Sequence, residues 1–394
     1  MDKSIKKSLE FLNQKFSEYY NSSDIQLPDR FSRREFAFTF FGGKGMVRHL
    51  SFGKRKEVIN FLKERIPQHA YYSSAYYKIP DAPTMNDKYW MGAELIFDLD
   101  SDHLPNSENL SYEKQLVTVK FEFEKLIKEF LIGDFGFDEK YLELYFSGGR
   151  GYHCHVKDPV IFDLGSNERR EIVDYITGRN LHDFYIFKEH ITSKKRYGRR
   201  DFPGEKSLKM PTPDQKGWKG RISKEIITII DEIKKSDDPV LSLKEYGVRE
   251  KDAIILAKEL SEERIRRIKD GYLDQSKTIR KFFLNKALRK AAVTLSAGET
   301  DEPVTCDIKR LIRLPYSLHG KTGFKVEKIT IDDLEDFNPL NDAIVFDDKP
   351  VKINLIEPFK IEINREKFNL DKGEAEVPEY LGVFLIGRKI AQIL

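Results

Sequence analysis

A short apolar run that ends in two aspartates constrains this chain more than any other segment. Leu95, Ile96 and Phe97 have the residue types of a buried strand, and Asp98 and Asp100 follow at alternating positions. Residues i and i+2 of a β-strand project from the same face, so both carboxylates would leave the strand on one side. Neighbouring carboxylates repel each other unless a cation lies between them. The pattern predicts a divalent-metal site, against the simpler interpretation of a strand that ends in an acidic turn.

Segments on either side of this run alternate between strand and helix patterns. Phe36, Phe38 and Phe40 alternate as in a half-buried strand, residues 113–130 repeat with helical period, and residues 142–146 indicate a strand. Residues 202–220 are rich in Pro and Gly, which is typical of a mobile loop. Residues 205–292 are helical in pattern. The sequence predicts an α/β fold of mixed α+β type, in which a mixed sheet carries a helical insertion.

Composition limits the classes of function. The 68 basic and 65 acidic residues nearly balance at a net charge of +3, so any polyanion site must be a local patch. The basic run 194–200 is one such patch, either a nucleic-acid contact or a solvated loop. Two distant cysteines, Cys154 and Cys306, argue against a disulfide scaffold or a four-cysteine zinc ribbon. No apolar run approaches about 20 residues and no signal peptide is visible, so we expect a soluble intracellular protein.

The segment from residue 147 to 155 combines glycines with hydrogen-bond donors. Glycines let the backbone approach a ligand closely, while Ser147, Arg150 and His153 supply donors that suit a triphosphate. The spacing is not that of a Walker P-loop. The alternative is an ordinary glycine turn between strands, with His153 as a core histidine.

A third segment, residues 307–323, places Asp307 among basic residues. A solvated basic face explains its lysines, but Arg313 is set between Leu311, Ile312 and Leu314. A buried cation in that apolar frame needs an anion from the protein or from a ligand.

These segments together resemble the small catalytic subunit of archaeal and eukaryotic DNA primases, and the archaeal branch fits best. Asp307 lies only a few residues before the run Arg310 to Arg313, as in that branch. The matching segments are Arg34–Phe36, Glu94–Asp100, Ser147–His153, Arg169–Ile176, Asp307–Gly323 and Phe337–Leu340.

The resemblance implies a role for each matching residue. Asp98, Asp100 and Asp307 match the catalytic carboxylates, which hold two Mg²⁺ or Mn²⁺ ions. The residues that match nucleotide-binding positions are Arg48, Ser147, Arg150, His153, Arg313 and His319. The implied fold is a primase catalytic core of mixed β-sheet flanked by helices, formed by residues 1–204 and 293–394, with the insertion at 205–292.

The implied function is the synthesis of short RNA primers, with DNA primers as a further option, on single-stranded DNA from NTPs or dNTPs. The reaction is a two-metal nucleotidyl transfer that releases pyrophosphate. The implied partner is a large primase subunit, and the expected location is the cytoplasm, at the nucleoid. The alternatives are a repair-type primase-polymerase that extends ends and a catalytically silent nucleic-acid-binding subunit.

One departure from the family concerns zinc. Many members carry a zinc knuckle after the aspartate strand, whereas residues 101–114 contain His103 and no cysteine. Tetrahedral structural zinc needs four ligands, usually including thiolates, so we expect no structural zinc there.

Overall fold

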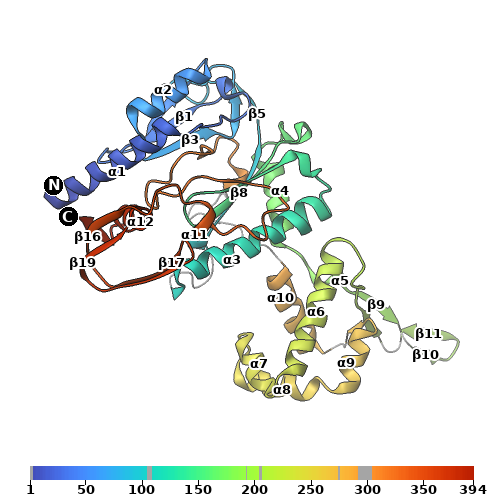
Figure 1. Ribbon diagram of the computed structural model, residues 1–394. Coiled ribbons are helices and arrows are strands. Elements are labelled where there is room, and N and C mark those ends of the chain that lie inside the picture. Colours follow the sequence, from blue (N-terminus) through green and yellow to red (C-terminus); the bar gives the residue numbers. More distant parts are fainter. Residues whose placement is uncertain (1–2, 104–108, 192, 204–205, 274–275, 292–303) are drawn as a thin grey trace. The chain divides into compact units, whose positions relative to one another are not determined.

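The computed structural model describes residues 3–103, 109–191, 193–203, 206–273, 276–291 and 304–394 (Figure 1). It separates into two compact units. The first comprises residues 1–132, 136–173 and 294–394, and the second comprises residues 133–135 and 174–293. The insertion expected at 205–292 lies within the second unit, which also takes in residues 174–204.

The first unit contains the N-terminal and C-terminal parts of the chain. The α-helices and strands before residue 178 are α1 (Lys3–Ser22), β1 (Phe36–Thr39), β2 (Val47–Leu50), α2 (Arg55–Arg65), β3 (His69–Ser73), β4 (Ala75–Tyr77), β5 (Trp90–Ala93), β6 (Leu95–Asp100), α3 (Tyr112–Lys125), β7 (Leu142–Phe146), β8 (Gly151–Val156) and α4 (Ser166–Thr177). Residues 174–177, at the end of α4, belong to the second unit. The elements after residue 303 are β14 (Leu311–Arg313), β15 (Lys328–Ile329), α11 (Pro339–Asp342), β16 (Pro350–Leu355), β17 (Phe359–Ile363), β18 (Glu366–Leu370), β19 (Gly373–Pro378), α12 (Glu379–Gly387) and β20 (Ala391–Ile393).

Two four-stranded sheets of this unit position the candidate site. The first has the strand order β14-β3-β1-β2 and the second has the order β15-β7-β8-β6. Each strand pair in the described ranges is antiparallel, so the sheet of mixed direction that we expected does not form. β6 and β7 run in the same direction but are not neighbours. β8 lies between them and pairs antiparallel with both.

Aromatic side chains form much of the core against the first sheet. Phe36 and Phe38 are fully buried, and the ring of Phe38 lies 4.6 Å from that of Phe61 on α2. The alternation of phenylalanines therefore marks β1 as predicted, although both of its faces are covered. The predicted class, mixed α and β structure, is confirmed.

The second unit is mainly helical but also contains strands. Its elements are α5 (Asp183–Ile186), β9 (Lys188–Ile191), β10 (Lys194–Tyr197), β11 (Arg200–Pro203), β12 (Lys206–Lys209), α6 (Gly217–Lys235), α7 (Pro239–Glu245), α8 (Glu250–Glu259), α9 (Glu262–Lys269), β13 (Tyr272–Leu273) and α10 (Lys277–Ala291).

The apolar stripe of α6 organises this unit. Ile222, Ile226, Ile229 and Ile233 recur at helical spacing and are buried, and α6 packs against α10. The mobile loop expected at 202–220 is wrong for residues 202–203, which belong to β11, and for 217–220, which belong to α6. It is also wrong for residues 206–209, because β12 pairs with β9 and β13. None of the helices in the described ranges has the length and apolar character that a membrane crossing requires.

Candidate active site

Two neighbouring strands bring three of the predicted site residues onto one face of the second sheet. Asp98 on β6 lies opposite His153 on β8, and Asp100 lies opposite Gly151. His153 Nε2 is 3.3 Å from Asp98 Oδ1. Among the described residues, the buried His153 Nδ1 has no hydrogen-bond partner. The strand period therefore places the two carboxylates side by side, as predicted.

The two aspartates have opposite pKa shifts. Burial alone would raise the pKa of Asp98, but the positive charge of His153, Arg310 and Arg313 outweighs it and holds that pKa below its usual value. Burial raises the pKa of Asp100, and the negative charges of Asp98 and Asp102 add to this rise. A second negative charge beside Asp98 is therefore costly without a cation.

Asp307 reaches this region from a distant part of the sequence. It follows the short helical turn Val304–Cys306, which packs against β6. Its Oδ1 accepts a hydrogen bond of 2.9 Å from the N–H of Lys309. Burial raises the pKa of Tyr77, and the negative charges of Glu35 and Asp307 raise it further, so both carboxylates lie near this phenol.

Arg48 lies on β2 and is already paired within the protein. Its Nε donates a 3.1 Å hydrogen bond to Glu35 Oε1, and Lys88 lies 3.5 Å from the other carboxylate oxygen. Glu35 is fully buried, whereas the Arg48 side chain is 39% exposed. Arg48 therefore offsets the charge of a buried acid while its own side chain stays partly exposed.

The glycine-rich segment forms a tight turn between β7 and β8. Ser147 Oγ accepts hydrogen bonds of 3.2 Å from the N–H groups of both Gly149 and Gly151. A Cβ on Gly151 would overlap the carbonyl oxygen of Leu99, and a Cβ on Gly148 would lie 2.7 Å from His319 Cβ. Glycine is thus required for the close approach of this turn to β6 and to His319.

Arg150 projects from the same turn. It forms an ion pair of 2.5 Å with Asp102 and a longer contact of 3.4 Å with Gln115. Asp102 is more than half exposed, so this ion pair is a surface contact that a more highly charged anion can displace.

His319 is joined to the glycine turn through Thr322. The Thr322 hydroxyl donates to the Gly148 carbonyl at 2.5 Å, so it accepts from His319 Nδ1 at 3.1 Å. Burial, with the positive charge of Arg313, lowers the pKa of His319 well below its usual value. The ring is therefore neutral, with its proton on Nδ1.

Arg313 lies on β14 and is held by residues of β3. Its Nη1 donates to His69 Nδ1 at 2.7 Å and to the Tyr71 hydroxyl at 3.3 Å. The N–H of Gly320 also donates to His69 Nδ1, at 3.2 Å. Because His69 Nδ1 accepts twice, the proton of this ring is on Nε2. Arg313 is thus oriented by two neutral acceptors.

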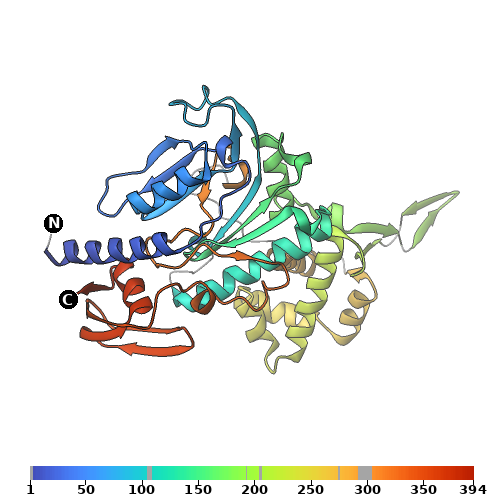
Figure 2. The same cartoon turned by 45° about the horizontal axis from the view of Figure 1, so that its top comes forward.

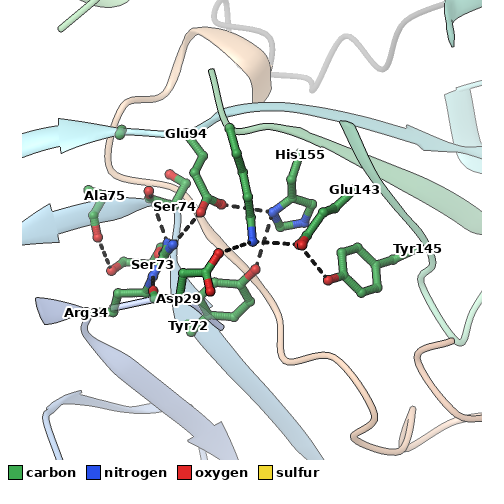
Figure 3. A network of polar contacts seen from close by, with 12 residues as sticks. Asp29, Arg34, Tyr72, Ser73, Ser74, Ala75, Glu94, Glu143, Tyr145 and His155 are labelled. Carbon is green, nitrogen blue, oxygen red and sulfur yellow. Dashed lines mark hydrogen bonds and ion pairs between the residues drawn. The ribbon is translucent and has the colours of Figure 1, made fainter. Parts of the chain in front are cut away.

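A buried polar network holds the start of β6 (Figure 3). Arg34 and Glu94 form an ion pair with both side chains fully buried, and His155 Nδ1 lies 3.0 Å from the other Glu94 oxygen. Burial would raise the pKa of Glu94, but Arg34 and His155 outweigh it and lower that pKa. Arg169 donates to the backbone carbonyls of Ala93 and Glu94 at 2.8 Å.

Comparison with known proteins decides the family. The model of the DNA primase small subunit family matches residues 97–331, more than half of the 394-residue chain. The chain belongs to the DNA primase small subunit family. It is similar to the DNA primase small subunit PriS of Methanothrix thermoacetophila, with 41% identity over 98% of this chain and 99% of that protein. The PriS of Picrophilus torridus is 40% identical over 96% of each chain.

In this primase chain, the predicted residues fall into two neighbouring groups. The acidic group contains Asp98 and Asp100, with Asp307 arriving beside β6. The other predicted residues lie on β2, β8 and β14, in the glycine turn and in the segment after β14: Arg48, Ser147, Arg150, His153, Arg313 and His319. Arg313 lowers the pKa of Asp98, so the two groups lie within electrostatic reach of each other.

Sequence reasoning about a primase chain missed His69. A single histidine gives no signal by itself, and its importance here comes from contacts with Arg313 and Gly320, far along the chain. Tyr71 lies on the same strand face and contacts the same arginine, but this relation is visible only in the structure.

The three aspartates suit a hard divalent cation, since carboxylate oxygens are the ligands that Mg²⁺ and Mn²⁺ prefer. In the described ranges, however, no three Asp, Glu, His or Cys side chains converge closely enough to form a complete metal site. What fits a cation here is the placement of Asp98 and Asp100 on one face of β6, where burial raises the pKa of Asp100. The predicted absence of a zinc knuckle concerns residues 101–114, of which 104–108 lie outside the described residues, so it stays a prediction.

Proposed function

We propose that this chain is the catalytic subunit of a DNA primase, which joins nucleotides into short primers on single-stranded DNA and releases pyrophosphate. The observation that carries this proposal is the shared face of Asp98 and Asp100 opposite His153. Asp98, Asp100 and Asp307 would hold the ions. Ions bound there would supply Lewis acidity, which would lower the pKa of the attacking 3′-hydroxyl and offset the charge of the leaving pyrophosphate.

The cationic side chains hold the incoming triphosphate in line with the acidic group. Arg150 exchanges its surface ion pair with Asp102 for a phosphate contact, and Arg313 is already oriented by His69. Catalysis in this proposal rests on positioning and electrostatic stabilisation, and no side chain acts as a nucleophile.

The template, the substrates and the partner belong to the same proposal. The template is single-stranded DNA, the substrates are NTPs or dNTPs, and a large primase subunit that carries the iron–sulfur cluster completes the enzyme. Its place of action is the nucleoid, in the cytoplasm.

The deciding experiment is de novo synthesis on a single-stranded template with Mg²⁺ or Mn²⁺, with NTPs and dNTPs supplied separately. Asp98→Ala and Asp307→Ala are compared with Asp347→Ala, which removes an exposed carboxylate on another segment. We expect metal-dependent products that vanish in the first two variants and persist in the third. Mn²⁺ binding, measured by titration calorimetry, should weaken in the same two variants.

Other results separate the alternatives. Extension of a supplied primer without initiation contradicts independent priming and indicates a polymerase core that needs its large subunit or acts in repair. Absence of products in both the priming assay and the primer-extension assay contradicts the enzymatic proposal and indicates a nucleic-acid-binding subunit. Near-normal synthesis by Asp98→Ala contradicts the metal assignment.

A further inference from the structure

The second unit carries an exposed basic hairpin that the proposed chemistry does not use. β10 and β11 pair as Lys195 with Phe202 and Tyr197 with Arg200, and a two-residue turn joins them. Gly198 in this turn has φ +67°, which suits a tight hairpin. In both views, the hairpin stands clear of the helices of its own unit (Figures 1 and 2).

The pairing sorts the hairpin side chains onto two unlike faces. Residues directly opposite each other in antiparallel strands share a face, and so do residues i and i+2. Lys195, Tyr197, Arg200 and Phe202 therefore project on one side, which we name the aromatic face. Lys194, Arg196 and Asp201 project on the other side.

The rings of the aromatic face lie near each other and in water. The ring centroids of Tyr197 and Phe202 are 6.2 Å apart with planes at 72°. Tyr197 is 71% exposed and Phe202 is 48% exposed. Exposed aromatic rings contribute little to folding, so a hairpin that keeps two of them on one side has surface available for a planar ligand.

The net positive charge of the hairpin favours a polyanion as its ligand. Residues 194–203 contain five basic side chains and one acid, and the acid is on the other face. Within the part of the chain that the structure describes, no carboxylate forms an ion pair with Lys195 or Arg200. Alternating aromatic rings and cationic side chains suit a single-stranded nucleic acid. Its unstacked bases can lie against the rings while its phosphates contact the cations.

We propose that the aromatic face of the β10–β11 hairpin binds the single-stranded DNA template, with Tyr197 and Phe202 stacking on bases and Lys195 and Arg200 contacting phosphates. The proposal deepens the proposed function and rests on it for the identity of the polynucleotide. A duplex is a poorer ligand, because its bases are stacked within the helix and out of reach of the two rings.

The test measures binding of a fluorescein-labelled oligodeoxythymidylate by fluorescence anisotropy, without metal or nucleotide, over a range of salt concentrations. Tyr197→Ala/Phe202→Ala should raise the Kd about tenfold or more, since one stacked base contributes about 1–3 kcal/mol. The dependence of Kd on salt should stay unchanged in this variant. An abasic oligonucleotide should bind wild type and variant equally, and Tyr197→Phe should bind as wild type does.

The charge variants form a matched pair within the hairpin. Lys195→Ala/Arg200→Ala and Lys194→Ala/Arg196→Ala each remove two positive charges, one pair from each face. The first should reduce the slope of log Kd against log salt by about 1.4, the value for two lost phosphate contacts. The second should reduce it by clearly less. Equal effects of the two charge variants, or a ring variant that binds like wild type, overturn the proposal.

This assay keeps the inference separate from the proposed function. Primer synthesis together with normal binding by the ring variant overturns the hairpin site and leaves the enzymatic proposal standing. Ring-dependent binding by a chain that makes no primers supports the hairpin site and counts against the enzymatic proposal. Thermal melting confirms that the variants fold.

Discussion

Arg313 Nη1 and His69 Nδ1 are joined by a 2.7 Å hydrogen bond between strands that are 244 residues apart in sequence. The same His69 nitrogen accepts the N–H of Gly320, next to His319. One neutral ring thus holds both a cation and a backbone turn of the proposed triphosphate site. His69 is a positioning residue in this arrangement.

Replacing His69 should affect nucleotide binding more than the chemical step. His69→Ala leaves Arg313 without its acceptor, and we expect KM for the nucleotide to rise about tenfold while kcat changes little, since a hydrogen bond to a charged group contributes about 1.5–3 kcal/mol. His69→Gln retains an acceptor oxygen and should restore most of the affinity. A loss confined to kcat in His69→Ala contradicts this positioning role. Steady-state kinetics with a varied nucleotide concentration make the measurement.

The same histidine should make stability depend on pH. Burial, with the positive charges of Arg313 and Lys321, lowers the pKa of His69 from 6.5 to about 3. The unfolded chain takes up this proton first, so stability falls as the pH drops below about 6.5, by about 2 kcal/mol at about pH 5. Burial lowers the pKa of His155 and of His319 as well, which adds losses of the same sign.

Denaturant unfolding at several pH values tests this dependence. His69→Gln should show a shallower fall in the free energy of unfolding between neutral and mildly acidic pH. His190→Gln, which replaces an exposed histidine, should keep the slope of the wild-type chain. Identical slopes in His69→Gln and wild type rule out His69 as a source of the acid sensitivity.

Removing one partner of the buried ion pair should destabilise the fold strongly. Glu94→Gln leaves the buried Arg34 guanidinium without a counter-charge, and we expect a loss of about 3–5 kcal/mol. Glu10→Gln makes the same chemical change in an exposed pair with Lys6 and should cost less than about 0.5 kcal/mol. Similar losses for the two variants would show that burial of the Arg34 pair is unimportant. Urea titration gives both values.

Adding one methyl group at Gly151 should disturb the acidic strand. Its Cβ would overlap Leu99 O and lie 3.1 Å from Asp100 Cα, so β8 must move away from β6 where the aspartates lie. We expect Gly151→Ala to cost about 1–3 kcal/mol of stability and to reduce primer synthesis. Gly53→Ala is the control, because its Cβ would meet Glu57 Oε2 at an ordinary 3.8 Å. Full activity of Gly151→Ala contradicts the close approach of these strands.

Local patterns were enough to predict the strands of the candidate site but not the contacts that complete it. β6 is recognisable because its apolar run and alternating aspartates lie within six residues. The pairing of Arg34 with Glu94 joins positions 60 residues apart, and that of His69 with Arg313 depends on which strand lies beside β3. Such contacts leave no local period in the sequence.

The error at residues 206–209 has a related cause. Pro and Gly nearby predicted a mobile loop, but β12 gains backbone partners from β9 and β13. The content of Pro and Gly indicates only the local conformational preference of the backbone. A strand of four residues is stabilised by the strands beside it, which composition does not reveal.

The Arg34–Glu94 pair also has a consequence for how β6 can pair during folding. A shift of β6 by one residue along β8 would turn Leu95, Phe97 and Leu99 toward the face that now carries Asp98 and Asp100. The same slip would move Glu94 away from Arg34 and leave two unpaired charges in the core, which makes the shifted sheet far less stable. The buried pair thus favours the native register of β6 and β8 over shifted registers during folding. The aspartates are therefore aligned before any ligand binds.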